Sequence, residues 1–328
     1  MGDSAEHSDV SGSMVEGAAV SAATAPLRQL AGKAAFITGG ASGIGLGIAD
    51  ACVAAGMSVV LADLRRDHID AALERFGGSD AVHAIELDVC DRVAFARAVE
   101  QSQRLLGNVH LLVNNAGIAI GGPITEVGYD DWDWGLGVLL GGVINGIQSF
   151  LPHMLAHGEG GQIVNTASTS GLLPVSRMVI YNTAKAALIA IAESIREELG
   201  ERNIGVSAFC PGPVGTNIRE SGRSRPERYR HDSGLLQAER EREGRPNSPL
   251  WMTPAECGER LLRGVRENDL YILTHPEFKD GLAERYRAIL ASFPDEEIDT
   301  ERAAEVPFLL RNAVFAEVLE RRASAGDL

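Results

Sequence analysis

Three side chains in the middle of this 328-residue chain have the types and spacing needed to move a proton to or from an oxygen. Tyr181 and Lys185 stand four residues apart in the segment YNTAK, so a helix places them on one face. A tyrosine with an ordinary pKa of about 10 is a poor acid–base group at neutral pH unless a cation favours its phenolate. Lys185 supplies that cation and can also hold ribose hydroxyls. Ser168, thirteen residues before Tyr181, offers a hydroxyl to the same substrate oxygen.

A glycine-rich turn is the second place where chemistry is expected. The segment TGGASGIG carries Gly39, Gly43 and Gly45 between an apolar run and a helical stretch. A turn without side chains lets backbone N–H groups approach a pyrophosphate, which also lies at the positive end of the following helix. A lone glycine pattern is weak evidence, but one that joins a predicted strand to a predicted helix is much stronger. Ser42 and Ile44, in the same turn, complete the predicted phosphate-binding set.

An acidic residue follows at the end of the second apolar run. Asp63 lies twenty-four residues after Gly39. A carboxylate there can accept hydrogen bonds from both hydroxyls of an adenosine ribose, and it would repel a 2′-phosphate. This favours NAD over NADP as the cofactor. Arg65 and Arg66 follow closely and could bind a phosphate, which keeps NADP as the alternative.

The next two strand ends also carry candidate cofactor contacts. Asp88 and Val89 close the third apolar run, where they are placed to reach an adenine ring. The segment NNAG closes the fourth run and brings Asn115 to a point where backbone must pass near the cofactor.

These residues are spaced along an alternation of short apolar runs and amphipathic stretches. Continuous Val/Ile/Leu runs indicate strands buried on both faces, and their alternation with helices indicates βαβ units in a parallel sheet. We therefore predict a doubly wound α/β (Rossmann) fold. The predicted strands cover 34–39, 58–63, 82–89, 109–115, 161–168, 204–211 and 269–274, and the predicted helices cover 43–56, 66–76, 91–106, 130–157 and 177–201.

The same pattern sets the expected organisation of the chain. Residues 30–275 form one dinucleotide-binding domain, preceded by a tail at 1–29 that is disordered or mediates a contact in an oligomer. The Arg-rich stretch 217–250 interrupts the alternation. It is either a solvated insertion with local salt bridges or a substrate lid, since open α/β sheets bind ligands outside their strand C-termini. Residues 276–328 are expected to form a helical extension.

Composition limits the partners. The chain carries 30 Lys and Arg against 45 Asp and Glu, and this net charge of −15 argues against nucleic acid or an anionic membrane. No apolar run approaches the ~18 residues needed to span a bilayer. The four cysteines form no CxxC pair, which is typical of buried reduced thiols in a cytosolic protein, and no metal site is predicted. We expect a cytoplasmic protein acting on a small molecule.

Together these segments resemble the short-chain dehydrogenase/reductase family, over roughly residues 30–275. The resemblance implies that Val214 and Thr216, in CPGPVGT, touch a nicotinamide carboxamide, and that Pro211 shapes the floor beneath the ring. The matching pieces are TGGASGIG, Asp63, Asp88, NNAG, Ser168, YNTAK and CPGPVGT.

The resemblance also implies a reaction. Hydride passes between a carbinol carbon and the nicotinamide, while Tyr181 exchanges the hydroxyl proton. Ser168 orients and polarises that oxygen, and Lys185 lowers the pKa of Tyr181 and anchors the ribose. Family members commonly assemble as dimers or tetramers through long helices, here expected at 130–157 and 177–201.

Within the family, the segments DDWDW, VINGI and YILTHPEFKDGL and the Arg-rich insertion are similar to bacterial dehydrogenases of bulky aromatic secondary alcohols. Those include the Cα-dehydrogenases of lignin β-aryl ethers. This second resemblance implies a large, aromatic alcohol or ketone as substrate.

Leu139 is the main departure from the family pattern. Members usually carry an asparagine in the helix after NNAG, where a helix irregularity holds a water that connects the catalytic lysine to solvent. Aligning that pattern with WDWGLGVLLGGV puts Leu139 at this position, and Asn145 lies six residues further on. The helix is expected to be distorted here, which local glycines make easy.

Three interpretations of Leu139 stay open. In the first, backbone carbonyls alone hold the water and leave a working catalytic set. In the second, the site is slowed and serves a reaction that needs less proton relay. In the third, the chain is a cofactor-binding protein with weak or lost catalysis. The intact Ser168, Tyr181 and Lys185 favour an enzyme.

Overall fold

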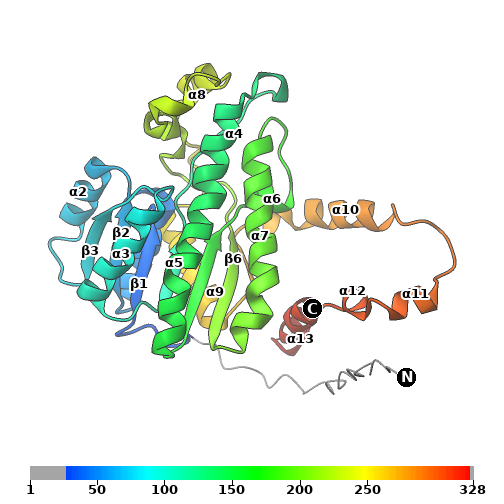
Figure 1. Cartoon of the computed structure of the whole chain (residues 1–328). Helices are drawn as coiled ribbons and strands as arrows, with labels where there is room; N and C mark the ends of the chain where they lie inside the picture. The colour runs from blue at the N-terminus through cyan, green and yellow to red at the C-terminus, as the bar shows by residue number, and fades with distance from the viewer. Residues whose placement is uncertain (1–26, 326–328) are drawn as a thin grey trace, which may run out of the picture.

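The computed structural model of the chain describes residues 27–325. Within them a seven-stranded sheet runs in the order β3-β2-β1-β4-β5-β6-β7, and all neighbouring strands are parallel (Figure 1). The predicted doubly wound architecture is confirmed, and each predicted strand is present, most of them shorter than predicted. The strands are β1 (Ala34–Thr38), β2 (Ser58–Asp63), β3 (Val82–Glu86), β4 (Leu111–Asn114), β5 (Gly161–Thr166), β6 (Ile204–Cys210) and β7 (Tyr271–Leu273).

Helices cover both faces of this sheet and bury its apolar residues in two cores. One core joins the sheet to α3, α5 and α7, and the other joins it to α1, α2 and α9. The alternation of inward-facing residues along β1 shows the division, since Phe36 belongs to the first core and Ile37 to the second. The helices are α1 (Gly43–Ala54), α2 (Arg66–Arg75), α3 (Arg92–Leu106), α4 (Tyr129–Leu136), α5 (Gly142–His157), α6 (Thr169–Leu172), α7 (Val179–Gly200), α8 (Leu236–Arg242) and α9 (Pro254–Glu267).

The glycine-rich helix predicted at 130–157 is divided by a π-helical turn at Gly137–Gly141, which joins α4 to α5. The expected distortion is therefore present. Glycines beyond the turn allow close packing: a Cβ on Gly142 would lie 2.7 Å from Val89 Cγ2, and one on Gly146 would lie 2.0 Å from Asn114 Oδ1. The missing side chains let α5 approach the strand ends that border the site. A π-turn in a long helix often marks a functional region.

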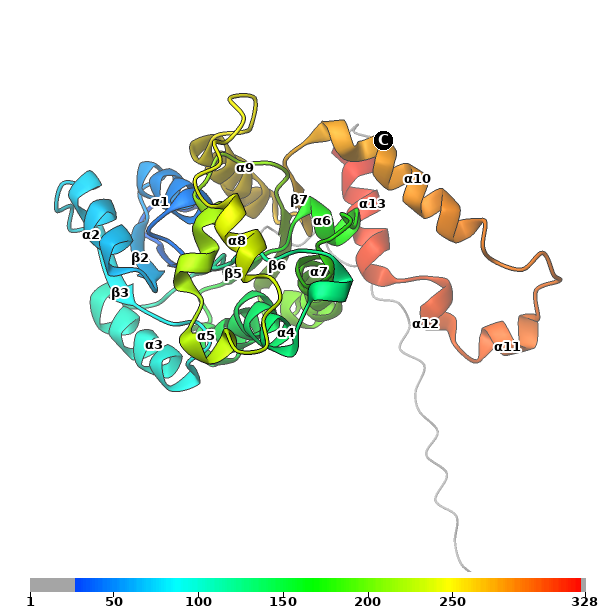
Figure 2. The ribbon, with the colours of Figure 1, turned by 90° about the horizontal axis from the view of Figure 1, so that it is seen from above.

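The stretch 217–250 folds as short helical pieces over the C-terminal ends of the strands. They are the 3-10 helices η3 (Ile218–Ser224) and η4 (Glu227–Tyr229), followed by α8, and Figure 2 shows α8 above the middle of the sheet. We call this stretch the insertion.

The C-terminal extension forms an arm that leaves the body and returns to it (Figure 2). None of the side chains of α10 to α12 is buried, and Leu309 is 74% exposed. The return is anchored on α7, where Glu317 accepts a 2.8 Å hydrogen bond from buried Arg196. The arm consists of α10 (Lys279–Leu290), α11 (Thr300–Ala304), α12 (Pro307–Leu310) and α13 (Ala313–Ala325).

One helical stretch, Tyr129–His157, has the length and mean hydropathy of a membrane span. Half of its most apolar window is buried inside the protein, as expected for the core helix of a soluble protein. Most of the tail predicted at 1–29 lies outside the described residues.

All four cysteines of the chain are free thiols. Cys52, Cys210 and Cys257 are buried, as predicted, and Cys90 is half-buried. Burial raises the pKa of each thiol to about 12.

Candidate active site

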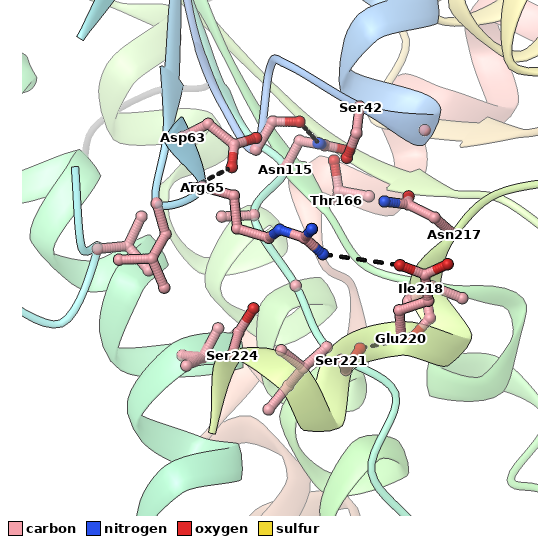
Figure 3. Close-up of a pocket in the computed structure, with 18 of the residues that line it drawn as sticks. Ser42, Asp63, Arg65, Asn115, Thr166, Asn217, Ile218, Glu220, Ser221 and Ser224 are labelled. Carbon is pink, nitrogen blue, oxygen red and sulfur yellow. Dashed lines mark hydrogen bonds and ion pairs between the residues drawn. The ribbon is translucent and has the colours of Figure 1, made fainter. Parts of the chain in front are cut away.

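A pocket lies at the C-terminal edge of the sheet, where each of the first six strands contributes its end or the residues just after it. This is the place where parallel α/β sheets bind ligands. Figure 3 shows Asp63, Asn115 and Thr166 on the sheet side and Glu220, Ser221 and Ser224 on the insertion side. Eleven of the predicted site residues line this pocket: Gly39, Ser42, Gly43, Ile44, Asp63, Asp88, Val89, Asn115, Tyr181, Lys185 and Thr216.

The glycine-rich turn leads from β1 into the N-terminus of α1. Gly39 and Gly43 have φ values of +61° and +51°, in the left-handed region that favours glycine. A Cβ on Gly45 would lie 2.0 Å from the carbonyl oxygen of Gly39, so this residue serves the close packing of the turn and is not part of the pocket lining. Ser42 caps α1 without a side-chain hydrogen bond, which leaves its hydroxyl and the first N–H groups of the helix facing the pocket region.

The turn is held by the end of β4. The Asn115 side-chain amide donates to the carbonyl oxygens of Thr38 and Gly39, at 3.0 and 3.3 Å. The hydroxyl of Thr38 in turn accepts hydrogen bonds from the backbone N–H groups of Asn115 and Ala116. Asn115 therefore fixes the position of the turn as well as lining the pocket.

Asp63 lies at the end of β2 with its carboxylate largely buried. Its two oxygens accept backbone hydrogen bonds from Ala41, at 3.2 Å, and from Arg65, at 3.1 Å. The Arg65 side chain extends along the pocket and forms ion pairs with Asp67 and, across the pocket, with Glu220 of the insertion (Figure 3).

Ser168, Tyr181 and Lys185 lie close together, and the last two line the pocket. Ser168 caps the short helix α6, and its side chain lies close enough to the Tyr181 hydroxyl to lower the pKa of that hydroxyl. Tyr181 and Lys185 lie one turn apart on α7, with the ammonium 5.5 Å from the centre of the phenol ring. Lys185 Nζ donates a 2.6 Å hydrogen bond to the carbonyl oxygen of Thr166. Of the three, Ser168 does not itself belong to the pocket lining.

Burial dominates the electrostatics of this group. It lowers the pKa of Lys185 to about 8, and the buried position of Tyr181 raises the pKa of its hydroxyl, against a smaller lowering by the Ser168 hydrogen bond. The net shift of the Tyr181 pKa is therefore upward, and the lowering by Lys185 that the resemblance implies stays a prediction. The physical reason is desolvation, which disfavours both the phenolate and the ammonium.

Leu139 lies inside the π-turn with no exposed surface. It packs with Ile118 and Trp134, and its Cδ2 lies 3.4 Å from where a Cβ on Gly117 would be. Lys185 Nζ lies 3.9 Å from that same point, so Leu139 places apolar surface near the ammonium of Lys185.

Asn145 does not replace the asparagine that family members usually carry at the position of Leu139. Its side-chain amide donates a 2.8 Å hydrogen bond to the carbonyl oxygen of Val89, a residue of the pocket lining. Val214 is buried and forms a parallel bridge with Met252, outside the pocket lining, while the neighbouring Thr216 lines the pocket.

Sequence reasoning missed the pocket residues supplied by the insertion and by α4. Trp134 lines the pocket and is held under the guanidinium of Arg225, 4.2 Å from the indole ring. The lining from the insertion consists of Asn217, Ile218, Glu220, Ser221, Ser224, Pro226, Arg228 and Tyr229. No local signal marked these residues, because charged and polar segments show no apolar periodicity.

The residues of the pocket fit a nicotinamide dinucleotide. The side-chain-free turn and the N-terminus of α1 suit a pyrophosphate, and the Asp63 carboxylate suits a ribose. The buried hydroxyl of Thr166, beside Lys185, has no hydrogen-bond partner among residues 27–325 and so is available to a ligand. Among residues 27–325 no group of three or more His, Cys, Asp or Glu could hold a metal ion.

Comparison with known proteins identifies the class. The short chain dehydrogenase family matches residues 33–227. The chain belongs to the short-chain dehydrogenase/reductase family and is a nicotinamide-dependent oxidoreductase acting on CH–OH donors.

Its similarity to particular members is extensive. It is 38% identical over 294 residues, 87% of this chain and 96% of the relative, to a C alpha-dehydrogenase of Sphingobium sp. (strain NBRC 103272 / SYK-6). A putative short-chain dehydrogenase from Novosphingobium aromaticivorans superposes with a TM-score of 0.74 at 34% identity, covering 90% of this chain and 99% of that one. A short chain dehydrogenase/reductase from Burkholderia phymatum in complex with NAD superposes with a TM-score of 0.73 at 32% identity, covering 83% of this chain and 99% of that one. The predicted resemblance to Cα-dehydrogenases is confirmed.

Proposed function

We propose that this protein is an NAD-dependent dehydrogenase that interconverts a bulky aromatic secondary alcohol and its ketone. The observation that carries the proposal is the convergence of Ser168, Tyr181 and Lys185 on a pocket with an aromatic wall. The similarity to a C alpha-dehydrogenase supports the same substrate class.

Each residue of the set has a role in the proposed reaction. A nicotinamide held in this pocket would supply the hydride chemistry at the carbinol carbon, in either direction. Tyr181 takes the hydroxyl proton as the alcohol becomes a ketone, and gives it back in the reverse direction. Ser168, beside the Tyr181 hydroxyl, donates a hydrogen bond to the same substrate oxygen. Lys185 holds the ribose and, when charged, stabilises the Tyr181 phenolate.

The walls of the pocket support an apolar, aromatic substrate. Trp134, Val138 and Ile118 line it from the side of α4 and the β4 loop, and Tyr229 closes it from the insertion. Contacts with the Tyr229 ring and with the small exposed part of Trp134 favour an aryl group over an alkyl group of similar size.

The preference for NAD follows from Asp63 and from the complex of a similar protein with NAD. NADP stays the alternative because Arg65 lies beside Asp63.

The test is NADH oxidation with a panel of aryl ketones, compared with acetone. We expect kcat/KM to be roughly 100-fold higher for the aryl ketones, since burying an aromatic ring contributes about 2–3 kcal/mol. Tyr181→Phe should lower turnover at least about 100-fold, the usual contribution of general acid–base catalysis. Tyr286→Phe, at a half-exposed tyrosine of α10, is the matched control and should leave turnover unchanged. Undiminished turnover in Tyr181→Phe would disprove the mechanism.

A cofactor-binding protein with weak turnover is the second candidate, and Leu139 is the observation that favours it. It would bind NADH and show no substantial oxidation with any ketone of the panel.

A further inference from the structure

Arg65 and Glu220 connect the two sides of the pocket where the ribose of the proposed NAD would lie (Figure 3). Arg65 follows β2, and Glu220 belongs to η3 in the insertion, 155 positions further along the chain. Arg65 Nη1 lies 3.6 Å from Glu220 Oε2, and both side chains keep some exposure, at 24% and 33%.

The guanidinium of Arg65 is divided between two carboxylates. Its Nε and Nη2 edge binds the two oxygens of Asp67, with 3.0 Å between Nε and Oδ1. This pairing holds the pKa of Asp67 at about 2. Glu220 lies toward the remaining Nη1, so each side of the guanidinium is matched by a negative charge.

Asp63 adds a third carboxylate to this group. The charges of Asp67, Glu220 and Asp63 all raise the pKa of Arg65. Three carboxylates face this one guanidinium, and their negative charge opposes a phosphate on the adenosine ribose. Without Glu220 the Nη1 edge of Arg65 would be free for a bidentate contact with such a phosphate.

The insertion makes a second contact on the same side of the pocket. Asn217 Nδ2 lies 3.4 Å from His68 Nε2 of α2, and both residues line the pocket. Glu220 is therefore held near Arg65 by a neighbouring residue of the insertion, and also by Arg223, whose Nη1 lies 3.2 Å from the Glu220 carboxylate.

We propose that Glu220 is a determinant of cofactor specificity: it occupies the free edge of Arg65 and so prevents this arginine from binding the 2′-phosphate of NADP. The proposal rests on the proposed function in assuming that the pocket binds a nicotinamide dinucleotide. It assigns to the insertion a part in choosing the cofactor, in addition to any contact with the alcohol.

The test measures the dissociation constants of NADH and NADPH by fluorescence titration, without substrate. In Glu220→Gln the preference for NADH over NADPH should fall about fivefold, the size expected for one partly exposed charge. Glu227→Gln is the matched control, since Glu227 lies in the same insertion, is 83% exposed and does not line the pocket. Its preference should equal that of the native protein. An unchanged preference in Glu220→Gln would overturn the proposal.

A double variant tests the route through Arg65. In an Arg65→Gln background, adding Glu220→Gln should change the preference for NADH over NADPH by less than twofold, because the guanidinium that Glu220 pairs with is absent. A full fivefold change in that background would overturn the assigned route. If the native protein binds neither cofactor, the proposed function itself fails, and this result is distinct from either outcome for Glu220.

Discussion

The ammonium of Lys185 donates a hydrogen bond to the carbonyl oxygen of Thr166, over 2.6 Å between two buried residues. The same burial lowers the pKa of Lys185 to about 8, from an ordinary value of 10.5. The protein therefore keeps the Lys185 ammonium in a place from which water is excluded. The charged form of this lysine lowers the free energy of unfolding.

Lys185→Met should stabilise the protein while it abolishes turnover. The lowered pKa corresponds to a cost of about 3 kcal/mol at pH 7, and losing the hydrogen bond to Thr166 offsets about 1 kcal/mol. We expect a net gain of about 2 kcal/mol in the free energy of unfolding, measured by urea denaturation. In the native protein, folded Lys185 loses its proton above pH 8, whereas the unfolded chain keeps it up to about pH 10.5. The free energy of unfolding of the native protein therefore rises between these two pH values. The advantage of Lys185→Met over the native protein should shrink over the same range.

Lys279→Met is the control for that experiment, because Lys279 is exposed at the start of α10. Its effect should stay within about 0.5 kcal/mol at every pH. A destabilised Lys185→Met at pH 7 would contradict the assignment of a desolvated ammonium.

Leu139→Asn should cost stability without creating activity. Leu139 is fully buried in an apolar cluster, so an amide there loses packing and hydrogen bonds, at about 2–4 kcal/mol in the free energy of unfolding. If the site works as proposed, NADH oxidation with an aryl ketone should stay within a few-fold of the native rate. Leu139→Met conserves volume and should cost less than about 1.5 kcal/mol. Turnover that appears only in the asparagine variant would favour the cofactor-binding alternative.

Arg225 should prove necessary for the attachment of the insertion. Its side chain is fully buried between Asp131 of α4, at 2.8 Å, and Glu239 of α8, and it covers the indole of Trp134. Arg225→Met leaves two buried carboxylates without their cation, which typically costs about 3–5 kcal/mol. We expect a lower unfolding midpoint, faster trypsin cleavage within 217–250, and a raised KM for the ketone.

The exposed Arg240→Met, on α8, is the control for Arg225. This variant should have the unfolding midpoint and the KM of the native protein. Trypsin should cut the insertion at its remaining sites at the native rate. Native stability and KM in Arg225→Met would show that the insertion is held by other contacts.

Homo-oligomerisation through the long helices remains a prediction. Ile144 and Leu155 on α5 are 41% and 38% exposed, on the helical stretch whose most apolar window is half buried. We expect sedimentation to give two or four times the 34.8 kDa chain mass, and Ile144→Asp to lower it. Val93→Asp, at an exposed valine of α3, should not change it. A monomeric native protein would contradict the prediction.

The fold could be predicted because its signals are local. Each strand is a continuous apolar run, as at SVVLAD in β2, and burial on both faces of a parallel sheet requires such runs. The site residues at strand ends follow from the same alternation, since the C-terminal ends of parallel strands share one edge. Even the irregular turn around Leu139 was anticipated, although its π-helical geometry was not.

The contacts of the insertion could not be predicted in the same way. Arg225 and Asp131 lie 94 positions apart, and Arg65 and Glu220 lie 155 apart. A charged residue in the sequence looks the same whether it is solvated or buried against a distant partner, so only the folded arrangement distinguishes Arg225 from the exposed arginines around it.

The protonated state of the four cysteines makes the chain a convenient object for fluorescent labelling. Maleimides react with thiolates, and thiols whose pKa is about 12 supply almost none at neutral pH. A single cysteine introduced at the exposed position of Gln237, on α8, would therefore be the dominant reactive group without removal of the natural ones. A dye at that position would report any change in the surroundings of α8 as NADH is added.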